Sequence, residues 1–250
     1  MSKIDSKTSN KILYLDVGNS SIKGAYKEGM NWKAPLAQKG LTAAELVTWI
    51  NEHPESFTDV VVSSVRKDVR EAIHESLGTV NVKELTVHDI PHELLDYETP
   101  ETLGIDRFLA CYGATEQTTN SVVVIDAGTA ITIDFMDQDD VYHGGLIAPG
   151  ISSYAEMLSQ KAPALPQVEM EIPQTWPGKS TIDSLKWGQA GFIRMAIEAT
   201  LTKYEIEFGP FDLFFTGGDG ATVQSLISAE GKQRPFLVFE GMERMVKSGQ

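Results

Sequence analysis

The stretch that decides the fold is VVVIDAGTA (residues 122–130), which ITID (131–134) follows directly. A run of apolar β-forming residues leads into the segment Asp126-Ala127-Gly128-Thr129, and an alternating apolar and polar strand follows. This pattern predicts a hairpin whose tight turn carries an acid, a glycine and a hydroxyl group.

An earlier stretch repeats the pattern, as ILYL (12–15), DVGNS (16–20) and SIKGAY (21–26). Asp16 lies 110 residues before Asp126, and Gly18 lies at the same distance before Gly128. The repetition predicts two related halves, each of which contributes one turn to a shared cleft.

These turns have the composition of a phosphate-binding site. Glycine lets the backbone approach a phosphate closely and direct N–H groups toward it, and the neighbouring hydroxyl or amide adds a hydrogen bond. Because aspartate and phosphate are both anionic, the natural partner of the aspartate is a cation, here Mg²⁺ or its bound waters. The alternative is an ordinary hairpin with a turn-forming aspartate, and the second copy makes that interpretation weaker.

Composition limits the class of protein. The chain has 250 residues, of which 42% are hydrophobic, as in a globular protein with a substantial core. A net charge of −14 argues against a nucleic-acid-binding surface. Residues 1–10 indicate a flexible tail rather than a signal peptide, and no stretch approaches the length of a membrane span. The single cysteine, Cys111, excludes an internal disulfide, and we expect a cytoplasmic protein with a buried, inert thiol.

Strands and helices alternate along the chain, which indicates an α/β fold with a partly parallel sheet. Thr42 and Glu45 have the spacing of a capping box at the start of a helix. The further elements that we expect are strands at 59–65, 80–87, 211–215 and 236–239 and helices at 67–77, 107–117 and 182–204.

Three further segments carry possible chemistry. Asp106 precedes Arg107 at the start of a helix, where the helix dipole favours an anion; a simple N-cap explains Asp106 equally well. His143 lies beside two glycines and is interpreted as a turn residue rather than a catalyst. Residues 178–180 (GKS) have neither the upstream glycine nor the preceding strand of a P-loop, so we reject that motif.

Together these motifs carry a family resemblance. DVGNSSIK (16–23), DAGTA (126–130) and TGGD (216–219) resemble the phosphate-1, phosphate-2 and adenosine motifs of the acetate kinase, sugar kinase, heat-shock ATPase and actin superfamily. LGIDR (103–107), GGLIAPG (144–150) and FEGM (239–242) resemble the type III pantothenate kinases in particular. The fold that this implies is α/β, with two actin-like (ribonuclease H-like) halves at 11–115 and 116–250, each a mixed sheet flanked by helices.

The resemblance also implies roles for individual residues. Asp106 would accept the proton of the pantothenate hydroxyl, and Asp126 would contact a monovalent cation, K⁺ or NH₄⁺. Mg²⁺ would accompany ATP. The residues that would bind ATP are Asp16, Val17, Gly18, Asn19, Ser20, Ser21, Ile22, Lys23 and Thr129. The residues that would bind pantothenate are Tyr97, Gly104, Ile105, Asp106, Arg107 and Thr181. Ser20 stands where the family usually has threonine, and it keeps the hydroxyl.

The expected activity is ATP-dependent phosphorylation of pantothenate to 4′-phosphopantothenate, the first step of coenzyme A biosynthesis, by a homodimer that binds neither nucleic acid nor membrane. Another small-metabolite kinase or a phosphatase of the same superfamily is the alternative among enzymes. A non-catalytic regulator on this fold is the alternative from another class, although a regulator could dispense with Asp106 and Arg107, and both are present. A chaperone or filament ATPase is disfavoured, because 250 residues leave no room for its additional domain.

Overall fold

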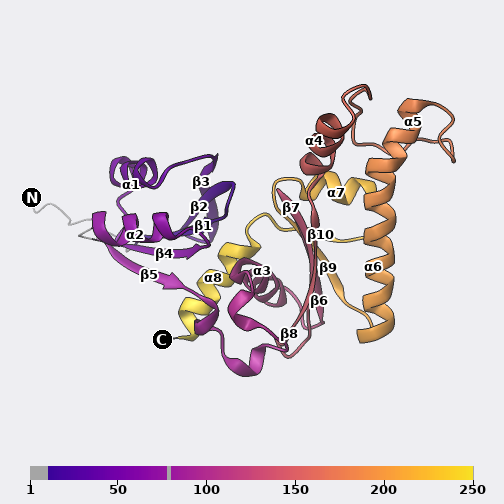
Figure 1. The fold of residues 1–250 in the computed structure, drawn as a ribbon. Helices are drawn as coiled ribbons and strands as arrows, with labels where there is room; N and C mark the ends of the chain where they lie inside the picture. The colour runs from indigo at the N-terminus through magenta and orange to yellow at the C-terminus, as the bar shows by residue number, and fades with distance from the viewer. Residues whose placement is uncertain (1–10, 78–79, 250) are drawn as a thin grey trace, which may run out of the picture. The chain divides into compact units, whose positions relative to one another are not determined.

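The computed structural model describes residues 11–77 and 80–249, which form two compact units (Figure 1). Among the described residues, the first unit contains 11–89, 104–106 and 245–249, and the second contains 90–103 and 107–244. The boundary expected at residue 115 stays a prediction. The expected tail, residues 1–10, lies outside the described residues.

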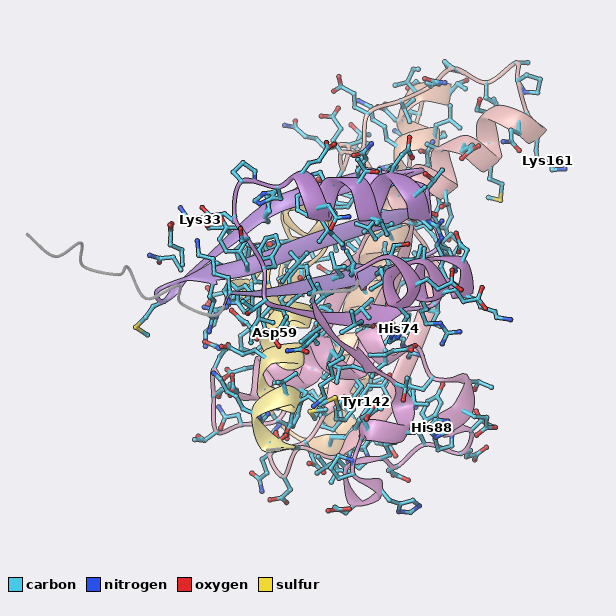
Figure 2. The ribbon with its side chains drawn as sticks, turned by 90° about the vertical axis from the view of Figure 1, so that its left-hand side faces the viewer. Lys33, Asp59, His74, His88, Tyr142 and Lys161 are labelled. Carbon is cyan, nitrogen blue, oxygen red and sulfur yellow. The ribbon has the colours of Figure 1, made fainter. Side chains whose placement is uncertain are left out.

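The first unit is built on a five-stranded sheet in the order β3-β2-β1-β4-β5. The strands are β1 (Ile12–Val17), β2 (Ser21–Glu28), β3 (Asn31–Lys39), β4 (Asp59–Ser64) and β5 (Asn81–Leu85). The first three strands are antiparallel, and β4 and β5 continue the sheet in parallel with β1. Sequence reasoning missed β3, which is mostly exposed and carries Lys33 at the edge of the sheet (Figure 2).

The core of the first unit lies between this sheet and two helices, α1 (Ala43–Glu52) and α2 (Lys67–Ser76). Alternate residues of β1, such as Leu13 and Leu15, are fully buried against Leu46 and Ile73 of the helices. Helix α1 begins as expected, because the Thr42 side chain accepts a hydrogen bond from the Glu45 backbone N–H and Glu45 bonds back to the Thr42 N–H.

The second unit repeats the same topology in the order β8-β7-β6-β9-β10. Its strands are β6 (Val122–Ala127), β7 (Ala130–Met136), β8 (Tyr142–Pro149), β9 (Asp212–Thr216) and β10 (Lys232–Gln233). Again the β6–β7–β8 segment is antiparallel, and β9 and β10 follow in parallel with β6. The duplication predicted from the two Asp-x-Gly stretches is therefore confirmed.

Helices cover both faces of this second sheet. The helices are α3 (Ile105–Thr115), α4 (Ile151–Lys161), α5 (Thr181–Lys186), α6 (Phe192–Phe208), α7 (Gly220–Leu226) and α8 (Leu237–Ser248), with short 3₁₀ turns at Val87–Asp89, His92–Leu94 and Pro100–Thr102. Figure 1 shows α6 on one side of the strands and α3 and α8 on the other. The expected helix 182–204 is formed by α5 and α6, which a π-helical turn (Trp187–Gly191) joins.

The expected strand at 236–239 was wrong, because these residues begin helix α8. Its buried residues, including Phe239, Met242 and Met245, recur at three-residue spacing on one helical face. Gly241 makes the packing possible: a Cβ atom there would contact the Leu109 carbonyl of α3, and one at Gly113 would contact the Leu237 carbonyl of α8. Four apolar residues in a row are compatible with either a strand or a buried helix. The close packing of α8 against α3 stabilises the helix here.

Candidate active site

The first Asp-x-Gly turn joins β1 to β2. Asp16 and Val17 end β1, residues 18–20 form the turn, and residues 21–23 begin β2. The Gly18 N–H donates to the Ser21 carbonyl at 3.0 Å, and the Gly40 N–H donates to the Ser20 carbonyl at 3.3 Å. The residues assigned to ATP in this half therefore form one continuous hairpin end, with Asn19 and Ser20 exposed.

The second turn, between β6 and β7, is one residue shorter than the first and is also closed by its glycine N–H. The Gly128 N–H donates to the Ala130 carbonyl at 2.9 Å, and the Gly150 N–H donates to the Thr129 carbonyl at 3.0 Å. Gly150 follows Gly40 by the same 110 residues that separate the two aspartates. Helix α4 starts directly after Gly150, as α1 starts shortly after Gly40.

The TGGD segment (216–219) packs against the end of β6, where the second turn begins. The Asp219 N–H donates to the Ala127 carbonyl at 2.8 Å. Gly217 has φ = +83°, and a Cβ atom there would contact both the Asp126 Oδ1 and the Ala127 carbonyl oxygen. Two hard oxygen atoms thus lie against a residue that has no side chain, and oxygen donors of this kind suit K⁺ or Mg²⁺. No cluster of three or more His, Cys, Asp or Glu residues suited to a metal occurs in the described part of the chain.

Asp106 and Arg107 are the second and third residues of α3, after Gly104, so Asp106 lies inside the first turn and is not the N-cap. Asp106 is half-buried, whereas Ile105 and Arg107 are buried. The Arg107 guanidinium lies against the carboxylate of Asp134 on β7, with Nη2 donating to Oδ1 at 2.6 Å and Nε to the same oxygen at 3.1 Å.

The Arg107–Asp134 pair shifts the pKa of both partners. Burial lowers the pKa of the Arg107 guanidinium, but the hydrogen bonds and negative charge of Asp134 outweigh it and raise that pKa above its ordinary value. Burial raises the pKa of the Asp134 carboxyl, and the hydrogen bonds from Arg107 and Tyr142 oppose this effect. Arg107 therefore stays charged at every physiological pH.

The structure brings together two of the residues assigned to pantothenate, because the Tyr97 side chain lies close enough to Arg107 to contribute to the raised pKa of its guanidinium. Gly144, at φ = +83°, leaves room for this tyrosine, since a Cβ atom there would lie 3.2 Å from the Tyr97 ring. Thr181 is exposed and begins α5. The cleft expected between the two Asp-x-Gly turns stays a prediction, as does the role of Thr181.

Sequence reasoning missed Asp134 and Tyr142. The available signal was an acid inside the apolar strand ITIDF (131–135), since a buried carboxylate needs a paired charge. His143 lies on β8 rather than in a turn, between the carboxylates of Asp96 (3.1 Å) and Asp137 (2.8 Å). Cys111 is fully buried, as expected, and burial raises the pKa of its thiol well above the ordinary value.

The duplicated fold and its paired turns are those of the actin-like kinases and ATPases. A hexokinase of the ROK type from Thermus thermophilus superposes with a TM-score of 0.52 at 11% identity, over 96% of this chain and all of that one, which shows the fold alone. A protein described as a putative Baf family transcriptional activator from Campylobacter jejuni superposes with a TM-score of 0.66 at 25% identity, over 95% of this chain and 98% of the other.

Comparison of sequences narrows this class to one family. The family model for type III pantothenate kinase matches residues 12–203. A type III pantothenate kinase from Flavobacterium johnsoniae is 35% identical, covering 83% of this chain and 86% of the relative. One from Listeria innocua is 30% identical, covering 94% and 96%. The chain belongs to the type III pantothenate kinase family, so its activity is the ATP-dependent phosphorylation of pantothenate in coenzyme A biosynthesis. No helix in the described residues is long and apolar enough to cross a membrane.

Proposed function

We propose that Asp106 accepts the proton of the primary hydroxyl of pantothenate as this hydroxyl attacks the γ-phosphate of ATP. The observation that carries the proposal is the position of Asp106 in the first turn of α3, half-buried and next to the charged Arg107. Phosphoryl transfer has a loose transition state, so the nucleophile loses its proton late and an ordinary carboxylate suffices. Positioning is then the main contribution of Asp106, and proton transfer adds roughly 10²–10⁴-fold.

The ATP phosphates are assigned to the two glycine turns, that is to Asp16–Lys23 and Thr129. Tyr97, Gly104–Arg107 and Thr181 are assigned to pantothenate. Mg²⁺, when bound with ATP, would offset the negative charge of the phosphates, and Asp16 is suited to its waters. The supporting feature is the same in both halves: a glycine N–H closes the turn, while the residues around it stay open to solvent.

A monovalent cation, K⁺ or NH₄⁺, is assigned to Asp126. Lys23 and Arg107 are the only cationic side chains within the recognised motifs, while ATP and the acidic turns bring several negative charges. A cation beside Asp126 would offset that repulsion. We also propose that the active form is a homodimer, which the exposed apolar side chains of the second unit support.

Asp106→Asn tests the proposal, because asparagine has nearly the same size and shape as aspartate but cannot accept the proton of the substrate hydroxyl. We expect the variant to keep its melting temperature and its KM for ATP, and to lose on the order of 10² or more in kcat. ADP release is measured with pantothenate and with a panel of other small hydroxy acids, in K⁺ and in Na⁺. Asp68→Asn is the matched control, since Asp68 also lies in the first turn of a helix, α2.

Near-normal turnover in Asp106→Asn would remove Asp106 from the mechanism and leave it as an acidic residue of the first helical turn. Equal turnover of the wild type in K⁺ and in Na⁺ would contradict the assignment of a monovalent cation.

A further inference from the structure

The ion pair between Arg107 and Asp134 is nearly closed to solvent. The two side chains are 8% and 2% exposed. Burying two charges costs several kcal/mol per ion, and apolar residues of similar size often stabilise a protein as well or better. Stability alone is therefore a poor reason for this pair, and its geometry points to another.

Asp134 holds the guanidinium along one edge. Both Nε and Nη2 of Arg107 donate to this carboxylate, at 2.6–3.3 Å. A guanidinium is a rigid planar fork, so fixing one edge also fixes the direction of its remaining N–H groups. Those groups are the ones with which Arg107 can reach a ligand.

Asp134 is itself held by a second side chain, and a glycine leaves space for it. The Tyr142 hydroxyl donates to Oδ1 at 2.8 Å, on the same carboxylate that accepts from Arg107. Tyr142, labelled in Figure 2, is fully buried. Gly145, opposite Asp134 on β8, leaves space for the carboxylate, since a Cβ atom there would lie 2.5 Å from Oδ1.

A second arginine–aspartate pair in the same unit shows the contrast. Arg244 of α8 donates to Asp140 in the β7–β8 turn, at 2.5 Å, and also to Thr115 and the Tyr112 carbonyl of α3. The side chains of Arg244 and Asp140 are 22% and 25% exposed. The Arg244–Asp140 pair connects α8, α3 and the β7–β8 turn and includes no residue assigned to substrate. The Asp134 carboxylate instead binds Arg107, which is assigned to pantothenate.

We propose that Asp134, supported by Tyr142, is a positioning residue that orients the Arg107 guanidinium for binding pantothenate. This inference rests on the proposed role of Arg107 in substrate binding. It predicts that loss of Asp134 weakens pantothenate binding through Arg107 alone and leaves ATP binding unchanged.

The first experiment compares KM values in steady-state kinetics. We expect Asp134→Asn to raise the KM for pantothenate roughly 10-fold or more, because an ångström of misplacement at a binding group can cost that much. The KM for ATP should stay within about twofold of the wild type. Asp140→Asn is the matched control: it weakens the other pair, and asparagine tolerates the positive φ of 64° at this position.

A double-mutant cycle then separates positioning from a general structural role. If Asp134 acts through Arg107, the variant R107Q/D134N has the same KM for pantothenate as R107Q. The proposal would be overturned if the KM for pantothenate of the double variant equalled the product of the two single effects. It would also be overturned if D134N raised the KM for ATP as much as the KM for pantothenate. If D134N is too unstable to assay, Tyr142→Phe decides, since it removes only the supporting hydroxyl: a raised KM for pantothenate supports the proposal, and an unchanged one overturns it.

The outcomes also distinguish this inference from the proposed function. If R107Q itself leaves the KM for pantothenate unchanged, the role of Arg107 in substrate binding is wrong. If R107Q raises that KM and D134N does not, only the positioning role of Asp134 fails.

Discussion

Gly217 links two motifs that lie far apart in the sequence. Its φ of +83° places its α-carbon against the Asp126 carboxylate and the Ala127 carbonyl. A side chain at this position would have to displace one of these oxygens, and it would also strain the backbone by about 1–2 kcal/mol. The first glycine of the TGGD segment, Gly217, is therefore needed for the geometry of the second turn.

We expect Gly217→Ala to raise the K⁺ concentration for half-maximal activity about 10-fold. The added methyl group would displace the Asp126 carboxylate, and a loss of about 1.4 kcal/mol in the binding free energy of K⁺ corresponds to that factor. Activity is measured against K⁺ at saturating ATP and pantothenate. Gly218→Ala is the control, since a Cβ atom there meets no heavy atom of the described structure within 4 Å. An unchanged K⁺ response in Gly217→Ala would separate Gly217 from the cation site.

The aspartates of the two turns were predictable because a local pattern carries them: an apolar strand, an acid, and a glycine two residues later. The partner of Arg107, Asp134, could not be predicted in this way. Arg107 and Asp134 are 27 residues apart, on a helix and a strand, and only the packing of α3 against the sheet brings them together. Local sequence therefore predicts the residues of a turn better than it predicts the pairs made by tertiary packing.

At the scale of elements, the crossing of α3 and α8 depends on two glycines. Gly113 and Gly241 each face the backbone of the other helix, at a distance that leaves no room for a methyl group. This contact also explains the error at residues 236–239: the apolar run was visible, but the glycine that allows a buried helix there was not interpreted. Strand β3 was missed for the opposite reason, since its residues are mostly exposed and carry little hydrophobic pattern.

We expect Gly241→Ala to lower the free energy of unfolding by about 1–3 kcal/mol, because the added methyl group would contact the Leu109 carbonyl and push the helices apart. Urea denaturation measures the change. Gly188→Ala is the matched control: its Cβ atom would meet no described atom within 4 Å, and alanine is about 0.5–1 kcal/mol better than glycine in a helical segment. Equal stability of the two variants would mean that α3 and α8 do not depend on this close crossing.

At the scale of the whole molecule, two buried ionisable side chains make the protein less stable at alkaline pH. Burial raises the pKa of the Cys111 thiol well above its ordinary value of 9.0, and it raises the pKa of Tyr204 from 10.0 to about 12. The folded state then binds these protons more tightly than the unfolded state does. Their contribution to stability is complete below the unfolded pKa and is lost as pH rises above it.

We expect Cys111 alone to lower the free energy of unfolding by about 1 kcal/mol at pH 10, which is above the ordinary pKa of a thiol. Urea denaturation between pH 8 and pH 10 measures this slope. Cys111→Ala should be less stable at pH 8 but should lack this part of the decline. The same slope in both proteins would mean that Cys111 stays protonated in the unfolded state or ionises freely in the folded one.

The second unit also carries an apolar surface that a second copy of the chain could cover. Ile147 on β8, Met157 on α4, and Phe192 and Met195 on α6 are between 47% and 65% exposed. A small groove lies among the same elements, lined by residues that include Leu146, Tyr154 and Phe192. A contiguous apolar patch on a protein surface marks an interaction site, and these four side chains lie on the strand and helices that also form the groove. In a twofold dimer the same patch meets itself, so each apolar residue is used twice.

We expect light scattering at micromolar concentration to give twice the chain mass of 27.4 kDa. A stable interface of this kind buries about 1,200–2,000 Å² in total, and a charge at its centre, buried without a partner, opposes association. Phe192→Glu should therefore give the monomer mass. Met30→Glu, an equally drastic change at a residue that is 93% exposed in the first unit, should leave the dimer intact. A wild-type protein of monomer mass, or a dimer that survives Phe192→Glu, would show that this apolar surface is not where two copies meet.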